Sequence, residues 1–281
     1  MGQARDPHSG PHELGVSVTA LRRMRSDPPG ASAYGREWFA ARAPATRSSA
    51  EAIVPFIIET VQPRSVVDVG CGTGSWLAVV TENGVPRIVG IDGDWIDRDQ
   101  LEFPAEYFVA RDLVHDRIAL DERFDLAVSL EVAEHLPAEM AASYVRELVG
   151  LAPVVLFSAA VPFQGGTGHR NEQWPTYWER LFRAHDYIGV DCVRPLFWND
   201  ERVRYFYAQN AVLYVERTKL PDLRDFRGVS EMGSPVRSLV HPHLYLNALR
   251  RFPAPEDVDV RGLGRFFARW GMSWLRRDRR A

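Results

Sequence analysis

The chain has 281 residues, of which 46% are hydrophobic and 25% are charged, and a formal net charge of −3. This length allows a hydrophobic core that needs no disulfide or metal ion to hold it together. The hydrophobic content is too high, and the net charge too low, for a wholly disordered protein. A dedicated nucleic-acid-binding protein usually carries a basic domain, so the charge balance argues against that class.

The sequence contains neither a cysteine framework nor a membrane-spanning segment. Cys71 and Cys192 lie far apart, so neither a cysteine zinc site nor a disulfide is expected. No apolar stretch approaches the roughly 20 residues that cross a bilayer. The first residues also lack the apolar centre of a secretory signal. We therefore expect a cytoplasmic protein.

Composition divides the chain into three regions. Residues 1–33 are rich in Gly, Pro, Ser and Arg, which predicts a mobile N-terminal extension. The main domain is expected over residues 34–218. Residues 219–281 are loop-rich and form a C-terminal appendage, in which the segment 260–280 sets aromatic and aliphatic residues among seven arginines. That segment predicts an amphipathic helix, either packed on the domain or serving as a surface for an anionic partner or membrane interface.

The predicted elements begin with a helix from Ser48 to Val61, because its apolar residues recur at helical spacing. Ser48 or Ser49 is the expected cap, and Pro63 follows the end of the helix. Short apolar runs then alternate with helix-sized segments. These runs are Ser65–Val69, Arg87–Ile91, Tyr107–Ala110, Phe124–Leu130 and Pro153–Ser158.

Such runs indicate strands buried on both faces, and their alternation with helices predicts a parallel sheet. Two later runs, Tyr187–Val193 and Arg202–Arg217, are expected to complete the sheet as strands, one of them reversed. The fold class is therefore α/β: a doubly wound, Rossmann-like sheet of seven strands with a reversed last strand, in three layers.

A glycine-rich turn follows the first predicted strand, where Gly70, Gly72 and Gly74 stand at alternate positions. Glycine lets a backbone turn sharply and approach a ligand closely. The helix that follows offers unpaired N–H groups and a partial positive charge, which suit a carboxylate or a phosphate. A tight turn with a purely structural role is the alternative.

Three aspartates indicate which ligand this turn would bind. Asp92 ends the second strand, where a carboxylate can accept hydrogen bonds from both ribose hydroxyls. Asp112 follows the third strand and could accept a bond from an exocyclic amine such as that of adenine. Asp68 would repel a pyrophosphate but attract an ammonium or a sulfonium. The set therefore favours S-adenosylmethionine over NAD or FAD.

The stretches DVGCGTG (68–74) and FDLAVSLEVAEHL (124–136), together with Asp92 and Asp112, resemble the class I S-adenosylmethionine-dependent methyltransferases. The resemblance covers residues 48–217 and implies a methyltransferase domain within 34–218. It implies that the methionine part is held by Asp68, Gly70, Gly72 and Gly74, with Cys71 in the same turn. It further places the ribose at Asp92, the adenine at Asp112 and Leu113, and the sulfonium and amine at the backbone of Leu130 and Glu131.

One cofactor-binding position departs from the family pattern. Gly93 stands where relatives often carry a bulky apolar residue against the adenine, and Trp95 is the candidate to replace it.

Two histidines fall where the family places the mouth of its active site. A hydroxyl acceptor benefits from a general base, and histidine has a suitable pKa. His169, in the loop after the fifth strand, is the leading catalytic candidate, and His135, after the fourth strand, is the reserve. The alternative for His135 is that it anchors the helix that begins there.

The alternative for the His169 loop is also structural. In that case Asn171 or Thr176 caps a helix over residues 177–185, while Trp174 and Trp178 pack on the domain. The pattern GTGHRNEQWPTYW (166–178) resembles a methyltransferase subgroup found among bacterial natural-product and glycan-modifying enzymes. This resemblance implies a sugar or another polyhydroxylated acceptor.

A divalent cation is a competing use of this region, with His135, His169, Glu131 and Glu172 as ligands. These residues are spread over two loops without tight spacing, so no metal site is expected. His241 and His243 lie in the loop-rich tail and are expected at the surface, unless the tail folds over the pocket.

The sequence as a whole predicts a methyltransferase that acts on a hydroxyl of a small polar acceptor. N-methylation of an amine or amide, which needs alignment more than a base, is the alternative chemistry. A non-catalytic, methyltransferase-like subunit is the alternative class, and an NAD-linked dehydrogenase is a more distant one. Nucleic-acid methylation is disfavoured by the charge and by the lack of a motif for holding a flipped base. Homo-oligomerisation stays open.

Overall fold

The computed structural model describes residues 36–118, 120–222 and 236–249. The expected N-terminal extension (1–33) and the arginine-rich helix (260–280) lie outside the described residues. Within the described residues, no helix combines the length and the apolar character needed to cross a bilayer.

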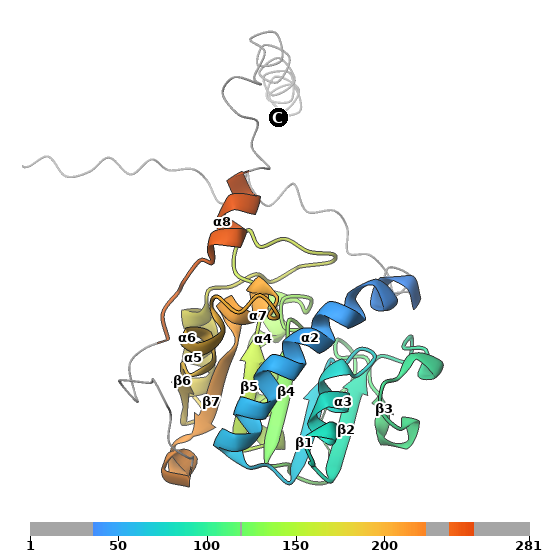
Figure 1. Ribbon diagram of the computed structural model, residues 1–281. Coiled ribbons are helices and arrows are strands. Elements are labelled where there is room, and N and C mark those ends of the chain that lie inside the picture. Colours follow the sequence, from blue (N-terminus) through green and yellow to red (C-terminus); the bar gives the residue numbers. More distant parts are fainter. Residues whose placement is uncertain (1–35, 119, 223–235, 250–281) are drawn as a thin grey trace, which may run out of the picture.

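Seven strands form one mixed sheet in the order β3-β2-β1-β4-β5-β7-β6 (Figure 1). The strands from β1 to β5 pair in parallel, whereas β7 lies antiparallel between β5 and β6. The predicted doubly wound, Rossmann-like sheet with a reversed last strand is therefore confirmed. The strands are β1 (Ser65–Val69), β2 (Arg87–Asp92), β3 (Phe108–Ala110), β4 (Leu126–Leu130), β5 (Val154–Ser158), β6 (Tyr187–Val190) and β7 (Val212–Glu216).

Helices cover both faces of the sheet (Figure 1). The α-helices are α2 (Arg36–Val61), α3 (Ser75–Glu82), α4 (Ala141–Leu151), α5 (Pro175–Arg183), α6 (Val193–Phe197), α7 (Tyr205–Asn210) and α8 (Pro242–Leu249). Short 3-10 turns are η3 (Arg98–Gln100), η4 (Ala105–Tyr107), η5 (Ala138–Met140) and η6 (Arg217–Asp222).

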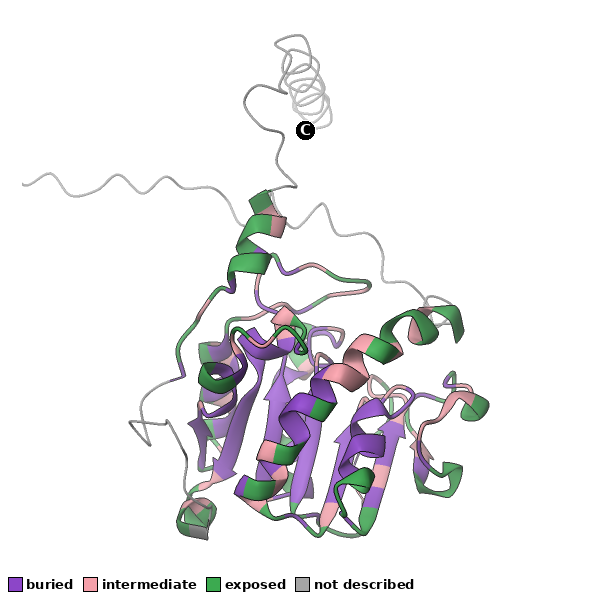
Figure 2. Ribbon diagram, in the orientation of Figure 1, coloured by how far each residue is buried: buried purple, intermediate pink, exposed green. Residues whose placement is uncertain are grey.

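Alternate residues of each strand contribute to two separate cores, which explains the continuous apolar runs of the sequence. Val66 and Leu126 pack toward α2 and α3, whereas Val67 and Ala127 pack toward α4 and α5. Neighbouring side chains of a strand point to opposite faces, so a strand covered on both sides must be apolar throughout. Figure 2 shows the resulting buried sheet between helices that are exposed on their outer sides.

The first helix is longer than predicted, and its expected cap is wrong. α2 begins at Arg36 rather than at Ser48, so both candidate cap residues stand inside it. Ser49 is buried, and its hydroxyl donates to the carbonyl of Ala45 and accepts from the N–H of Arg204. The additional turns bring Phe39 against the glycine loop, within 3.0 Å of the position that a Cβ on Gly72 would take.

The late strands are shorter than predicted. Within Arg202–Arg217 only Val212–Glu216 is a strand, and Tyr205–Asn210 forms α7 instead. The apolar run was ambiguous because Tyr207, Ala208 and Ala211 also recur at helical spacing, and all three pack into the core on the α2 side. The segment after Val190 likewise turns into α6 rather than extending β6.

Candidate active site

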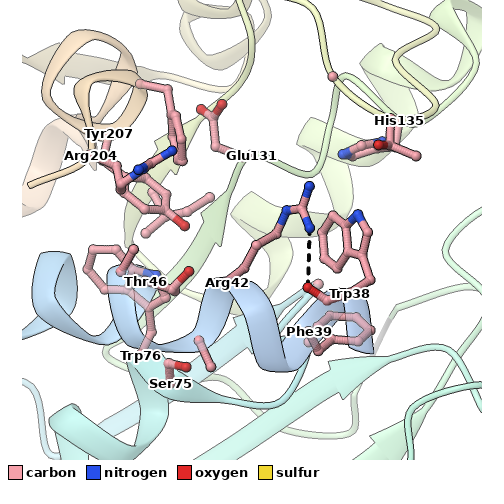
Figure 3. A pocket seen from close by; sticks show the side chains of 18 of the residues that line it. Trp38, Phe39, Arg42, Thr46, Ser75, Trp76, Glu131, His135, Arg204 and Tyr207 are labelled. Carbon is pink, nitrogen blue, oxygen red and sulfur yellow. Dashed lines mark hydrogen bonds between the residues drawn. The ribbon is translucent and has the colours of Figure 1, made fainter. Parts of the chain in front are cut away.

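A cavity of about 410 Å³ opens at the carboxyl ends of β1 and β4. These strands are neighbours in the sheet, but the chain leaves them toward opposite sides, so their following loops separate and leave a crevice between them. Figure 3 shows side chains of α2, α3, the end of β4 and α7 around this space. The expected residues that line it are Asp68, Gly70, Cys71, Gly72, Leu130, Glu131, His135 and His169.

The glycine loop requires glycine for reasons of backbone and space. Gly70 and Gly74 have φ angles of +81° and +86°, a region that side-chain-bearing residues rarely adopt. A Cβ on Gly70 would lie 2.4 Å from a methyl carbon of Val132, and one on Gly74 would lie 2.2 Å from the ring of Phe103. The tight turn is therefore built into the packing, and it leaves backbone rather than side chains on the cavity wall.

Two aspartates flank this loop. Asp68 is buried and lines the cavity, and burial, assisted by the nearby Asp92, raises the pKa of its carboxyl to about 8. The Asp92 carboxylate accepts hydrogen bonds from the N–H of Gly72 at 2.8 Å and of Gly93 at 2.7 Å. Burial raises the pKa of Asp92 to about 6, against the lowering effect of those two bonds. Asp92 thus holds the loop in place from behind the cavity wall.

The residues expected at the adenine lie away from the cavity wall. Asp112 is bonded to its own turn, where its carboxylate accepts from the N–H of Val114 and contacts Nδ1 of His115 at 2.8 Å. These bonds, together with the charge of His115, outweigh burial and lower the pKa of Asp112. Like Asp112, the expected residues Gly74, Asp92, Gly93 and Leu113 do not line the cavity.

Trp95 lies where the sequence suggested a replacement for a bulky residue. A Cβ on Gly93 would stand 2.2 Å from the indole ring of Trp95, so the ring fills that space. Gly93 is therefore required for the indole to pack against the backbone beside Asp92.

Glu131 is held in a strained conformation at the end of β4. Its φ angle is +57°, and its N–H donates to the carbonyl and hydroxyl oxygens of Ser158. Its carboxylate accepts from Nε2 of Gln164 at 2.6 Å and from Nδ2 of Asn210 at 3.1 Å. Burial raises the pKa of Glu131 despite these bonds. The carboxylate is thus fixed at the cavity by residues from two other segments.

The two candidate histidines meet beside a second glutamate. The rings of His135 and His169 are in edge contact, with centroids 4.9 Å apart. Nδ1 of His169 lies 2.9 Å from Glu172, and its Nε2 lies 4.0 Å from Oε1 of Glu134. Burial and the neighbouring His169 lower the pKa of His135 to about 4, although a bond to the backbone of Gly168 opposes the shift.

Glu134 is the functional candidate that sequence reasoning missed. It is fully buried, yet it lines the cavity together with both histidines. Burial, with the charges of Glu131 and Glu172, raises the pKa of its carboxyl well above the usual value. Its spacing from Glu131 in the stretch EVAEH was visible, but the sequence did not show that the side chain turns inward.

The loop that carries His169 is tied to the turn after β4. The carbonyl of Glu134 accepts hydrogen bonds from the N–H groups of Arg170 and Asn171 at 2.7 and 2.9 Å. The expected caps of α5 are wrong, because the helix starts at Pro175 after Trp174 with no side-chain cap. Asn171 bonds Gln173 instead. The loop is therefore held by its backbone hydrogen bonds to Glu134 rather than by a cap on α5.

The cavity has further walls that the sequence did not predict. α2 contributes Trp38, Phe39 and Arg42, and the guanidinium of Arg42 lies 4.0 Å from the Trp38 ring centroid (Figure 3). The segment Arg204–Tyr207 of the α7 region lines the opposite side. The helix was predicted to begin only at Ser48, and the segment of α7 was predicted as a strand. The sequence therefore could not place either wall. The only signal was the density of aromatic residues in both segments.

His241 is buried rather than exposed, contrary to the sequence-based expectation. Its Nε2 donates to the carbonyl of Trp198 at 2.8 Å, and its ring packs near Tyr205, which lines the cavity. His243 is exposed as expected. His241 therefore packs beside one cavity wall without lining it.

Comparison with known proteins identifies the domain. Residues 41–160 match the family model described as a methyltransferase domain. This span contains the glycine loop, Glu131, Glu134 and His135, but ends before His169. The chain therefore contains a methyltransferase domain whose methyl donor is S-adenosylmethionine. No curated protein matches the sequence.

Several solved structures are similar to this chain. They include magnesium protoporphyrin IX methyltransferase from Synechocystis PCC 6803, with 15% identity over 71% of this chain and 95% of that one and a TM-score of 0.45. A SAM-dependent methyltransferase from Archaeoglobus fulgidus shares 20% identity over 50% and 69%, with a TM-score of 0.41. An O-methyltransferase family protein from Burkholderia thailandensis shares 14% over 70% and 66%, with a TM-score of 0.44.

Proposed function

We propose that this S-adenosylmethionine-dependent methyltransferase transfers its methyl group to a hydroxyl oxygen of a small, sugar-like acceptor. The observation that carries the proposal is the imidazole pair of His135 and His169 on the wall of the cavity that also contains the glycine loop. Two imidazoles, which can accept a proton, thus line the same cavity as the expected cofactor site.

The residues present fit the cofactor. Backbone of the glycine loop, which no Cβ obstructs at Gly70, would hold the methionine part, and Asp68 would face its ammonium. Asp92, Asp112 and Leu113 lie outside the cavity wall, so the ribose and adenine would extend beyond the cavity along the carboxyl ends of β2 and β3, with the ribose at Asp92 and the adenine at Asp112 and Leu113. The cofactor supplies a methyl group on a positive sulfur, which an oxygen nucleophile attacks so that the C–O bond forms as the C–S bond breaks.

His169 is the group we assign to the proton of the acceptor hydroxyl. Its Nδ1 is bonded to Glu172, which orients the ring and leaves Nε2 as the nitrogen that faces Glu134. A positioned base of this kind typically contributes about 10²- to 10⁴-fold to a rate. An amine acceptor needs no such base, so the arrangement favours O-methylation over N-methylation.

Aromatic side chains on two walls support a sugar-like acceptor. Trp38 and Phe39 come from α2, and Tyr205 and Phe206 from the α7 region. Flat rings combined with a few fixed polar groups are typical of pockets that bind small organic ligands.

The proposal is tested by supplying labelled S-adenosylmethionine with paired acceptors, each a monosaccharide glycoside and its amino-sugar counterpart. We expect label in a stable methyl ether of the hydroxyl compound, identified by mass spectrometry after fragmentation. Transfer confined to the amino group would replace the proposal with N-methylation. Tight binding of S-adenosylhomocysteine without transfer to any acceptor would favour a non-catalytic subunit.

The Asp92 assignment predicts a pH-dependent cofactor affinity. The raised pKa of about 6 means that Asp92 is ionised above pH 7 and becomes protonated as the pH falls through 6. Because the ionised form accepts both hydroxyls best, we expect calorimetric affinity for S-adenosylhomocysteine to fall about 10-fold or more between pH 7.5 and 5. Asp92→Asn should bind more weakly at pH 7.5 and show a flatter pH profile. An unchanged profile in this variant would exclude Asp92 as the ribose acceptor.

A further inference from the structure

Glu134 is a buried carboxyl group without a cation or a donor side chain at hydrogen-bonding distance. Its side chain is 0% exposed, and no described side chain donates to either carboxylate oxygen, while the backbone of Glu134 itself and of Ala160 only partly offsets the effect of burial on its pKa. Buried carboxylates are usually paired with a cation or bonded to several N–H groups. The proposed O-methylation with His169 as base gives Glu134 no role.

The two neighbouring histidines turn nitrogen atoms toward this carboxyl. Glu134, His135 and His169 each offer one ligand atom, and these atoms all lie within 4.8 Å of one another. The Nε2 atom of His169 is 4.0 Å from Oε1 of Glu134, which is too long for a hydrogen bond. Ligands about 2.1 Å from one ion lie roughly 3–3.5 Å apart, so binding an ion would draw the three ligand atoms together by about 1 Å.

Second partners fix the orientation of both rings. Nδ1 of His169 is 2.9 Å from Glu172, and His135 is bonded to the backbone of Gly168. A histidine that binds a metal nearly always donates its other ring N–H to a carboxylate or carbonyl in this way. The carbonyl of Glu134 in turn accepts from two N–H groups of the His169 loop, so all three side chains are held on one rigid unit.

We propose that Glu134, His135 and His169 bind one divalent transition-metal ion, such as Mn²⁺ or Zn²⁺. Two imidazoles and one carboxylate suit such ions, whereas Mg²⁺ and Ca²⁺ prefer oxygen ligands throughout. Three protein ligands leave further coordination positions open toward the cavity. The structure thereby brings together ligands that are 34 residues apart in the sequence.

The consequence for the reaction rests on the proposed function. With the ion bound, Nε2 of His169 is a ligand, and the acidity of an acceptor hydroxyl at the site is raised by the ion. The hydroxyl proton then leaves to solvent water rather than to His169. Without the ion, His169 is the proton acceptor as described above.

The test uses the full chain, stripped with EDTA and dialysed, and titrated calorimetrically with MnCl₂, ZnCl₂ or MgCl₂ alone. We expect one Mn²⁺ or Zn²⁺ per chain, weak or no binding of Mg²⁺, and nitrogen couplings from two imidazoles in pulsed electron paramagnetic resonance of the Mn²⁺ form. Glu134→Gln and His169→Ala should each weaken binding at least about 100-fold, and Glu172→Gln about 10-fold. His185→Ala, a histidine outside the cluster, is the matched control and should bind as the parent does.

Each failure has a distinct meaning. Absence of Mn²⁺ and Zn²⁺ binding by the parent, or equal binding by the parent and by folded Glu134→Gln and His169→Ala, would overturn the site. Because Glu134 is buried, its variant is first checked for an unchanged circular dichroism spectrum; Glu172→Gln supplies an independent, milder test. Full O-methylation by the EDTA-treated protein would overturn the role of the ion and leave the proposed function intact. Tight metal binding without methyl transfer to any hydroxyl would confirm the metal site and overturn the proposed O-methylation.

Discussion

We expect His169→Ala to lower the turnover of hydroxyl acceptors about 10²- to 10⁴-fold at saturating cofactor, with affinity for S-adenosylhomocysteine nearly unchanged. His169 is the imidazole whose Nδ1 is fixed by Glu172 while Nε2 faces the cavity cluster. Its removal takes away the proton acceptor or, when an ion is bound, one of its ligands. In both cases we expect the loss in the chemical step. Cofactor binding should persist because it is assigned to the glycine loop and Asp68, which belong to other segments of the chain.

Steady-state kinetics and calorimetry of the same preparation check this result. Glu172→Gln keeps the imidazole but removes the charge that orients it, so it should show a smaller loss of turnover. His185→Ala lies outside the cluster and should be indistinguishable from the parent. Turnover by His169→Ala within a factor of a few of the parent would show that neither this imidazole nor an ion bound to it activates the acceptor.

The second large effect is expected on stability. Gly70→Ala should lower the free energy of unfolding by about 2–5 kcal/mol. About 1–2 kcal/mol comes from a side-chain-bearing residue at a φ angle of +81°, and about 1–3 kcal/mol from overpacking against Val132. Since Gly70 also lines the cavity, the folded fraction should bind S-adenosylhomocysteine more weakly. Urea unfolding followed by circular dichroism measures the first effect.

Gly84 offers a matched control for this substitution. Its φ angle is +89°, but nothing lies within 4 Å of the position that a Cβ would take. Gly84→Ala should therefore cost only the backbone part, about 1–2 kcal/mol, and leave cofactor affinity unchanged. Equal losses for the two variants would mean that the Val132 contact relaxes easily and that the loop does not depend on that close packing.

The sequence alone determined the sheet and the glycine loop. Apolar runs that alternate with helices specify strands buried on both faces, and this pattern is local, so five parallel strands could be placed closely. The glycine loop was equally readable, because Gly70 and Gly74 adopt positive φ angles that few other residues tolerate. Asp68 could be placed near the loop because two residues separate it from Gly70 along one strand.

Only the tertiary structure decided the other walls of the cavity. The start of α2 could not be read because Phe39 is held by its contact with the glycine loop, which lies 33 residues further along the chain. The run over Tyr205–Asn210 fits a strand or a helix, and packing against the core selected the helix. The position of Glu134 is the clearest case. Its burial beside His135 and His169 depends on two loops that follow different strands, and no local pattern encodes a distance between them.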